Sequence, residues 1–328
     1  EYIQVNKKGY IDFNPMDARF MDLYLKLFIH PLEKQGIDFF WNDYDVLENR
    51  NSLFILNDYM KKDMERNGRR SLVLARNANF APHRYPVLYS GHNKIDFEVL
   101  KNLPLFNIMA ANIGVSYWSH DVGGSVGGIE DNELYTRSVQ FGVFSPILRF
   151  NTEFGTYYKR EPWRWDVVTN NIVSYYLRLR NQLIPYIYTE MYHYHKEGIP
   201  LIKPFYYDYP FAYDDPIYIN QYFFGSSMLI APIVKKSDPL LNRTIQKIFI
   251  PDGVWYDFKT GKKFIGGKKY VSFYNIEDYP VFVKAGGIIP LAGINDLMSI
   301  NPPRELEIHV FPGANNSYNL YEDDGLTN

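Results

Sequence analysis

An acidic residue at the end of an apolar segment is the first candidate for chemistry in this sequence. The segment from residue 36 to residue 43 opens on a glycine, continues through aliphatic and aromatic residues, and ends on Asp43, two residues after Trp41. This pattern predicts a buried strand with a carboxylate at its C-terminal end. In a barrel of parallel strands, the active site lies at the C-terminal ends of the strands. A carboxylate beside aromatic rings suits a sugar, because the rings stack on it and the acid attacks its anomeric carbon.

Other predicted strands also end next to polar residues, namely Arg76 after 71–75, His92 after 85–91, Asp121 after 112–117 and Asn151 after 146–150. Helical patterns separate these strands, so the order is a βα repeat, which is typical of a parallel sheet. All five polar residues, Asp43 included, are then expected on one rim. The alternative for Asp43 is a capping role in the following turn, which is a common use of aspartate.

Helices are predicted from Asn14-Pro15 to Gly36, over 52–67, 97–109 and 130–141, and over 167–196 with a kink at Pro185. A last short strand is predicted at 198–202. No glycine-rich phosphate loop is present, which favours a barrel over a doubly wound sheet. About five strands can be counted, whereas a closed (β/α)8 TIM barrel needs eight. We therefore expect residues 1–224 to be a partial α/β barrel whose missing N-terminal half belongs to a longer polypeptide.

The character of the sequence changes after residue 224. Short strand patterns separated by turns such as Pro251-Asp252-Gly253 fill residues 225–302 and predict an antiparallel β-sandwich. Pro302-Pro303 reads as a linker, and residues 303–328 are expected to begin a distal β-domain that is incomplete.

The composition narrows the function further. The net charge of −2 gives no electrostatic footprint for nucleic acid, and no apolar run is long enough to span a membrane. The absence of cysteine excludes disulfides and thiolate metal sites but no compartment; with no signal peptide visible, a cytoplasmic location is favoured. The aromatic fraction is 17%, with 29 tyrosines, which suits carbohydrate binding and interfaces alike.

Several segments together resemble glycoside hydrolase family 31, the α-glucosidase and α-xylosidase family. These are Asp38–Asp43, Ser71–Arg76, His83–Val87 with Ser90-Gly91, Trp118–Gly124, Phe141–Pro146 with Arg149, Glu161–Trp163 and Tyr321–Gly325. The resemblance covers nearly the whole chain. It implies a retaining α-glycosidase that acts on α-linked oligosaccharides, needs no cofactor, and carries further domains upstream.

The resemblance also implies roles for individual residues. Asp43 falls on the nucleophile position, where it would form a covalent glycosyl-enzyme, and Arg76 falls on a substrate-binding arginine. Opposite charge from Arg76 would keep Asp43 ionised, although a plain buried ion pair is the alternative. Asp121 resembles a rim acid, with a strand-end cap as its alternative. Trp41 and Trp118 are expected to line the sugar pocket, and core packing is the alternative for both residues.

Two positions depart from the family pattern. Relatives read Ser-Gly-Asp-Thr where this chain has Ser90-Gly91-His92-Asn93, so His92 stands at the acid/base position. Asn151 stands where the family usually has a substrate-binding histidine. Histidine can act as a general acid, but a cationic ring would tend to quench Asp43. An inactive or impaired relative that binds carbohydrate is therefore the alternative.

The remaining titratable residues near these motifs are expected to be structural. Asp96 is the nearest other carboxylate to His92 in sequence and is expected on the next helix, pointing away. His120 is expected to be hydrogen-bonded below the rim. The spacing of His92, His120, Asp43 and Asp121 follows no metal-ligand motif, so no metal is predicted.

Overall fold

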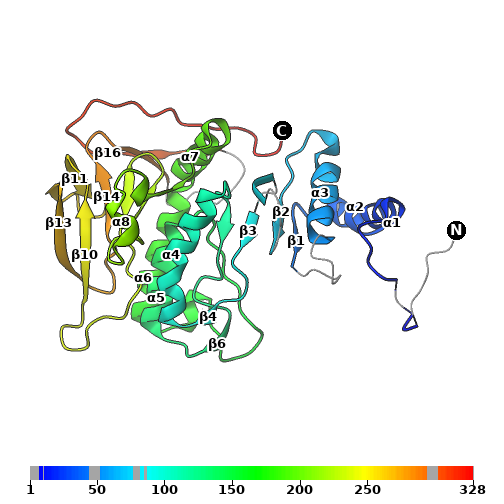
Figure 1. Cartoon of the computed structure of the whole chain (residues 1–328), viewed down its shortest axis with the longest axis horizontal. Helices are drawn as coiled ribbons and strands as arrows, with labels where there is room; N and C mark the ends of the chain where they lie inside the picture. The colour runs from blue at the N-terminus through cyan, green and yellow to red at the C-terminus, as the bar shows by residue number, and fades with distance from the viewer. Residues whose placement is uncertain are drawn as a thin grey trace. The chain divides into compact units, whose positions relative to one another are not determined.

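The computed structural model describes residues 7–9, 11–43, 52–76, 82–84, 87–293 and 302–327. The chain divides into two compact units, Glu1–Tyr89 with Asp324–Asn328, and Ser90–Asp323. Each unit has a hydrophobic core of its own. Figure 1 shows the elements of both units along the chain.

Three short parallel strands organise the first unit. They are β1 (Phe40–Asn42), β2 (Val73–Ala75) and β3 (Val87–Tyr89). The middle strand is β2, where Leu74 pairs with Trp41 on one side and with Val87 on the other. Parallel strands bring their C-terminal ends to the same edge, so the residues that follow them become neighbours. The strand predicted over 36–43 is therefore present but shorter than expected.

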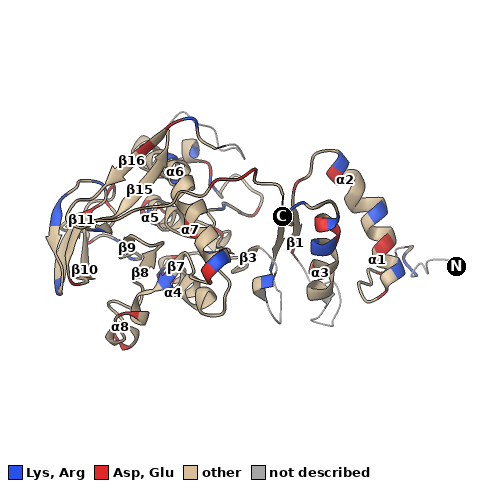
Figure 2. Ribbon diagram, turned by 90° about the horizontal axis from the view of Figure 1, so that it is seen from above, with Lys and Arg blue, Asp and Glu red and all other residues tan. Residues whose placement is uncertain are grey.

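Helical elements flank these strands. They are α1 (Ala18–Tyr24), the π-helical turn η1 (Leu25–Ile29), α2 (His30–Lys34), α3 (Ser52–Met64), and the 3-10 turns η2 (Glu65–Asn67) and η3 (Pro82–Arg84). The predicted helix over 52–67 is confirmed as α3 and η2, which end on Gly68 at a left-handed φ of +70°. Acidic and basic residues are interspersed along these helices (Figure 2), with ion pairs such as Lys26–Asp22 one turn apart.

The predicted helix start at Asn14-Pro15 is wrong. The helix begins after Asp17, whose carboxylate accepts hydrogen bonds from the backbone amides of Arg19 and Phe20. The Asn14 side chain accepts instead from the Met16 amide, over 3.1 Å, and so forms a turn that precedes the helix. Asn14 and Asp17 are both favourable N-cap residues, and the helix uses Asp17, which lies nearer to its first buried apolar residue, Met21.

The core of the first unit joins its two helical layers to the sheet. Met21, Leu25 and Ile29 recur every four residues along α1 and η1 and are buried. They pack with Met60 and other apolar residues of α3 and with Val73 of β2. An i, i+4 stripe is the pattern of a helix that buries one face.

The second unit begins with helices and very short strands. The helical elements are α4 (Phe97–Asn112), α5 (Asn132–Val143), η4 (Pro162–Arg164), α6 (Val167–Gln182), α7 (Ile184–Glu197), η5 (Phe205–Tyr207) and α8 (Phe211–Asp214). The strands are β4 (Lys94–Ile95), β5 (Trp118–Ser119) and β6 (Val126–Gly128). Asp96, Asp131 and Asp166 cap the N-termini of α4, α5 and α6 through their carboxylates.

Three sequence predictions need correction here. The strand predicted over 112–117 is wrong, because α4 continues unbroken through Pro104 to Asn112 and the strand β5 covers only Trp118–Ser119. The strand predicted over 146–150 is reduced to one parallel bridge between Ile147 and Ser119. The long predicted helix over 167–196 is two helices, α6 and α7, and Pro185 lies in the first turn of α7, where proline is tolerated.

An antiparallel sheet follows the helices. Its six strands lie in the order β12 (Lys263–Ile265), β11 (Val254–Asp257), β14 (Val281–Lys284), β9 (Met228–Ile230), β8 (Tyr222–Phe224) and β7 (Ile202–Pro204). Two antiparallel pairs accompany it, β10 (Thr244–Ile250) with β13 (Lys268–Tyr274) and β15 (Ile288–Ala292) with β16 (Leu306–Val310).

Both faces of the six-stranded sheet are covered. In β9, Met228 and Ile230 belong to the core that includes the helices, whereas Leu229 between them belongs to a second core with Ile248 of β10 and Trp255 of β11. This alternation confirms the predicted sandwich. The strand predicted at 198–202 as the last barrel strand instead begins this sheet as β7, because it pairs antiparallel with β8. The expected boundary after residue 224 thus divides the sheet between β8 and β9.

Within the part of the chain that the structure describes, no helix combines the length and apolar character that crossing a bilayer requires.

Candidate active site

A carboxylate, a guanidinium and a phenol meet at the C-terminal ends of the three parallel strands. Asp43 follows β1, Arg76 follows β2, and Tyr89 ends β3. The Tyr89 hydroxyl donates a hydrogen bond to Asp43 Oδ1, and Arg76 Nε donates to the Tyr89 oxygen over 3.0 Å. Arg76 Nε also lies 3.3 Å from Asp43 Oδ1. The expected pairing of Arg76 with Asp43 is therefore present, while the catalytic roles of both residues stay predictions.

Tyr89 is the residue of this cluster that the sequence analysis missed. It is buried, and burial together with the hydrogen bond to Asp43 raises its pKa to about 12, against the lowering effect of Arg76. At neutral pH its hydroxyl is protonated and acts as a donor. A signal was available in the sequence, because Tyr89 is the last residue of an apolar strand and such positions border the rim.

Trp41 stands beside this cluster. Its ring contacts Tyr89 edge to face, with 5.5 Å between centroids, and the guanidinium carbon of Arg76 lies 5.5 Å from the Tyr89 centroid. The Trp41 side chain remains 40% exposed. An exposed indole next to a carboxylate fits the predicted sugar-lining role better than core packing does, although that role also stays a prediction.

A second carboxylate cluster lies in the other unit, around Asp121. This side chain is completely buried, and both of its oxygens are engaged. Arg149 Nη2 forms an ion pair with Oδ1, and Asn151 Nδ2 donates to Oδ2 over 3.3 Å. Arg149 Nε also donates to Ser119 Oγ over 3.3 Å. The structure thus brings together two predicted site residues, Asp121 and Asn151, and ties both to the strand end at β5.

His120 is held beneath this cluster, as predicted. Its two ring nitrogens lie 2.9 Å from Ser90 Oγ and 2.9 Å from Asn107 Oδ1. Burial lowers the pKa of His120 to about 3, with a smaller contribution from the positive charge of Arg149. The ring is therefore neutral at physiological pH and serves as a hydrogen-bonding spacer rather than a proton donor.

His92 differs from these residues because its side chain is exposed. It forms no hydrogen bond or ion pair with any residue described in its own unit. The following residue, Asn93, is buried and fixes the backbone: its amide donates to Ser125 Oγ over 3.1 Å, and its carbonyl accepts from the Ser125 amide over 2.7 Å. His92 is thus a solvent-facing side chain on an anchored loop.

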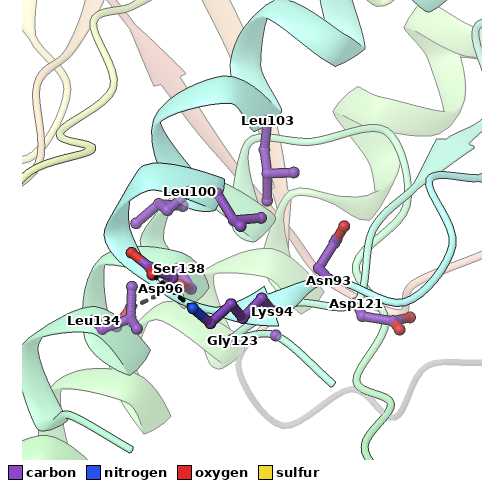
Figure 3. A pocket seen from close by; sticks show the side chains of 11 residues that line it. Asn93, Lys94, Asp96, Leu100, Leu103, Asp121, Gly123, Leu134 and Ser138 are labelled. Carbon is purple, nitrogen blue, oxygen red and sulfur yellow. Dashed lines mark hydrogen bonds and ion pairs between the residues drawn. The ribbon is translucent and has the colours of Figure 1, made fainter. Parts of the chain in front are cut away.

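Asp96, the other acid near His92 in sequence, lies at the N-terminus of α4 as its N-cap residue. Its carboxylate caps α4 by accepting from the Glu98 amide over 2.9 Å, and Lys94 lies 3.6 Å away. Figure 3 shows both side chains lining a small cavity together with Asn93 and Asp121. The cavity volume is about 10 Å³, which is room for about one water molecule and not for a sugar.

Trp118, the second tryptophan predicted to line a sugar pocket, is partly buried. It stacks on Phe106 of α4, with 5.5 Å between the ring centroids. Its Nε1 is buried without a hydrogen-bond partner among the described residues. Its ring also lies near the ring of His120, with 6.5 Å between the two centroids.

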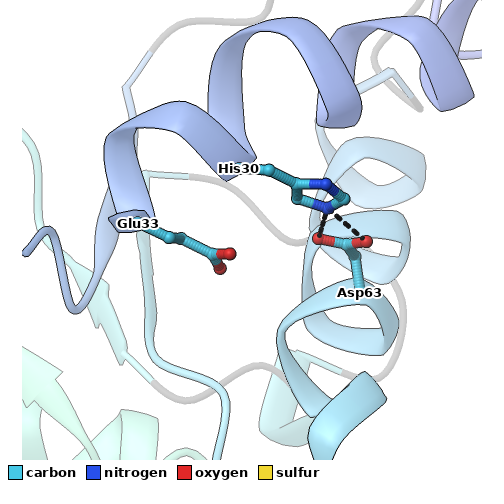
Figure 4. A group of neighbouring side chains, drawn as sticks. All are labelled: His30, Glu33 and Asp63. Atoms are coloured by element: carbon cyan, nitrogen blue, oxygen red, sulfur yellow. Dashed lines mark hydrogen bonds and ion pairs between the residues drawn. The ribbon is translucent and has the colours of Figure 1, made fainter. Parts of the chain in front are cut away.

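One group of side chains has the composition of a metal site, namely His30, Glu33 and Asp63 (Figure 4). His30 Nε2 lies 2.9 Å from Asp63 Oδ2, which joins α2 to α3. Arg66 already supplies a cation to both acids, because Nη1 lies 2.8 Å from Asp63 Oδ2 and Nη2 pairs with Glu33. With a guanidinium in place, we interpret this group as a helix–helix tie.

Two consecutive segments of the sequence match two domains of one enzyme family. Residues 1–190 match the glycosyl hydrolases family 31 TIM-barrel domain, and residues 198–289 match the glycosyl hydrolase family 31 C-terminal domain. The chain belongs to glycoside hydrolase family 31. This confirms the resemblance found in the sequence, and with it the fold class of a TIM-barrel portion followed by a β-sandwich.

Two curated relatives are named as enzymes that act on α-linked sugars. The chain is 30% identical over 279 residues to "Alpha-glucosidase 2" of Bacillus thermoamyloliquefaciens, covering 84% of this chain and 34% of that protein. It is 30% identical over 342 residues to "Alpha-xylosidase" of Saccharolobus solfataricus, covering 98% and 44% respectively. This chain thus spans less than half the length of the curated relatives that it matches.

Solved structures agree with this assignment. The chain superposes on a family 31 α-xylosidase from Xanthomonas citri with a TM-score of 0.79 at 26% identity, covering 99% of this chain and 39% of that one. A family 31 dextranase from Flavobacterium johnsoniae gives a TM-score of 0.83 at 24% identity, covering 99% and 44%. At that identity the second similarity speaks for the fold alone.

Proposed function

We propose that the protein containing this chain is a retaining α-glycosidase, with Asp43 as its nucleophile and α-linked oligosaccharides as its substrates. The observation that carries this proposal is the position of Asp43 at the C-terminal end of a parallel strand in a family 31 barrel domain, paired with Arg76. The Asp43 side chain is 28% exposed, so it is open to a ligand while its charge is balanced. α-Glucosidase-like specificity is the default, since an α-glucosidase is among the relatives.

The proposed reaction has two steps. An Asp43 oxygen bonds to the anomeric carbon while the bond from that carbon to the leaving oxygen breaks, and the leaving oxygen takes a proton. Water then attacks the same carbon, gives up a proton, and releases the Asp43 carboxylate. His92 stands at the sequence position of the group that donates the first proton and accepts the second. Its exposed ring can exchange protons with solvent.

The other site residues are proposed to bind the sugar. Arg76 carries a fixed positive charge beside the nucleophile, and Trp41 and Trp118 offer rings for stacking. Asn151 offers its amide. Both oxygens of Asp121 are already engaged, so we propose that Asp121 acts on the sugar by holding Arg149 and Asn151 in place.

The first test is turnover of an aryl α-glucoside by the full-length protein and by Asp43→Asn. An aryl leaving group needs little protonation, so this substrate reports on the nucleophile even if His92 is a weak acid. We expect Asp43→Asn to lower kcat/KM by at least about a thousandfold. Equal rates for the two proteins would remove Asp43 from the mechanism.

The alternative function is carbohydrate binding with impaired or absent catalysis, and His92 is the observation that favours it. Restoring the family residue by His92→Asp should then raise hydrolysis of natural disaccharides by about a hundredfold or more, because a matched general acid contributes about that much. Sugar binding by the unmodified protein without turnover would support the alternative. An unmodified protein that already hydrolyses disaccharides rapidly would rule it out.

We also propose that further polypeptide, most simply an N-terminal half of the same protein, covers the outer face of α1, η1 and α2. This face exposes Leu23, Leu27, Phe28 and Leu32, with Leu27 and Phe28 at 64% and 62%. Such a stripe is larger than scattered surface residues explain. Faster hydrogen exchange of these helices in an isolated 1–328 fragment than in the full-length protein would support this; equal exchange would contradict it.

A further inference from the structure

Two hydrogen-bond donors converge on one oxygen of Asp43. The Tyr89 hydroxyl donates to Oδ1, and Arg76 Nε lies 3.3 Å from the same atom. The other oxygen, Oδ2, accepts no hydrogen bond from a residue described in this unit. Among the described residues, the carboxylate is thus held through Oδ1, which fixes the direction in which its second oxygen points.

Tyr89 is itself fixed by contacts on its ring and its oxygen. Trp41 packs against the ring, and Arg76 donates to the phenolic oxygen over 3.0 Å. Because Arg76 occupies the acceptor side of the hydroxyl, the phenolic proton is left to point at Asp43. Only 1% of Tyr89 is exposed, so water does not compete for that proton.

We propose that Tyr89 is a positioning residue, which holds Asp43 through a hydrogen bond to Oδ1 and leaves Oδ2 to form the bond with the anomeric carbon. This inference rests on the proposed role of Asp43 as nucleophile. Tyr89 undergoes no covalent change in the reaction. When Oδ2 bonds to carbon, the leaving oxygen takes the electron pair of the broken bond, and Oδ1 becomes the carbonyl oxygen of an ester.

The hydrogen bond from Tyr89 to Asp43 has opposite effects on the formation and the breakdown of the glycosyl-enzyme. A hydrogen bond to a charged carboxylate is stronger than one to a neutral ester carbonyl. Tyr89 therefore stabilises Asp43 before attack, which slows formation of the glycosyl-enzyme, and stabilises the carboxylate that departs, which speeds its breakdown. The net gain comes from orientation, since a displaced reacting atom costs rate.

The decisive measurement is the chemical shift of the Asp43 carboxyl carbon, followed by ¹³C NMR in full-length protein labelled at the aspartate carboxyl carbons. Asp43→Asn identifies the signal. Tyr89→Phe removes one donor to the carboxylate but keeps the ring, so the Asp43 signal should move. Tyr194→Phe is the matched control, since Tyr194 is a half-buried tyrosine that donates to the Gly114 carbonyl. It should leave the Asp43 signal unchanged.

A second variant tests the opposite direction and avoids loss of the hydroxyl. Replacing Tyr89 with 3,5-difluorotyrosine makes the phenol a stronger donor, so the Asp43 signal should move in the direction opposite to that seen with Tyr89→Phe. An Asp43 signal that moves in neither Tyr89 variant would overturn the proposal. The result holds whether or not the protein turns over sugar, because the readout is the carboxyl itself.

Kinetics separate this inference from the proposed function. If Asp43→Asn abolishes aryl glucoside turnover, then Tyr89→Phe should lower kcat with little change in KM, because the substrate still binds but the reacting oxygen is no longer held in place. An unchanged kcat would reject the positioning role and leave the glycosidase proposal intact. Full activity of Asp43→Asn would reject the proposed function, while the NMR signal would still decide whether Tyr89 holds the carboxylate.

Discussion

Each unit of the chain contains an aspartate paired with an arginine at the end of a parallel strand, but the two pairs have different surroundings. Asp121 is 0% exposed and has a partner on each oxygen, whereas Asp43 is 28% exposed and, among the residues that the structure describes, is held through one oxygen. A carboxylate satisfied on both sides in a buried setting can only support structure or position its neighbours. A carboxylate that is half satisfied and open can still react. Burial and the count of partners, not the presence of the pair, distinguish a carboxylate that supports structure from one that can react.

The largest effect should follow from breaking the buried pair. Arg149→Ala leaves the Asp121 charge buried with Asn151 as its remaining side-chain donor, which should lower the free energy of unfolding by about 3–5 kcal/mol. Urea denaturation of the full-length protein, monitored by tryptophan fluorescence, measures this change.

A double variant is the control for that experiment. Arg149→Met combined with Asp121→Leu removes both charges, so it should recover most of the lost stability. If the double variant were as unstable as Arg149→Ala, lost packing around Arg149 rather than an unpaired charge would be the cause.

The next effect is a pH dependence of stability that originates at His120. Its pKa is about 3 in the folded state and near 6.5 in an unfolded chain, so only the unfolded state takes up the proton between these values. Stability is therefore complete above pH 6.5 and falls as the pH is lowered, by about 2–3 kcal/mol between pH 6.5 and 4.5.

Urea midpoints measured across that pH range test this expectation. His120→Asn cannot take up the proton, so its stability should fall less steeply towards acid than that of the unmodified protein. Parallel curves for the two proteins would show that His120 is not the source of the acid sensitivity.

The open pair should respond in the opposite way to the buried pair. Arg76→Ala should lower the free energy of unfolding by less than about 1 kcal/mol, because the pair is partly exposed to water. Turnover of an aryl α-glucoside should nevertheless fall by at least about tenfold, since a fixed charge beside the reacting carboxylate is lost. Arg76→Lys keeps the charge and should restore part of that activity. A large loss of stability without loss of rate would make this pair the structural one.

The contrast between the pairs also explains what the sequence could predict. Asp43 and Arg76 were found because each follows a short strand, and parallel pairing brings such ends together. Tyr89 was missed because its position at the end of an apolar strand indicates the rim but does not show whether its hydroxyl donates to a site residue or the side chain belongs to the core. The burial of Asp121 was equally invisible, since it depends on Arg149 and Asn151, which lie about thirty residues further along the chain.

The errors in secondary structure have a related cause. Short apolar runs do not distinguish strand from helix, and residues 112–117 were assigned to a strand although α4 extends to Asn112. The run at 198–202 was placed in the barrel because the direction of pairing, antiparallel to β8, is set by contacts across the chain and not by local pattern. These errors did not change the predicted βα order or the family motifs, because both depend on the order of the elements along the chain and not on where each element begins and ends.

The smallest effect is expected at Asp96, and it tests whether a third carboxylate replaces the acid missing at position 92. Asp96 caps α4 through the Glu98 amide, a contact that asparagine can also make. Asp96→Asn should therefore change neither stability, by more than about 0.5 kcal/mol, nor the rate with disaccharides, whereas Asp96→Ala should cost about 1 kcal/mol of stability alone. If Asp96→Asn abolished disaccharide hydrolysis while sparing an aryl glucoside, Asp96 would be the proton donor. His92 would then have no role in proton transfer, and the hydrogen bond from the Glu98 amide to Asp96 would have to break when substrate binds.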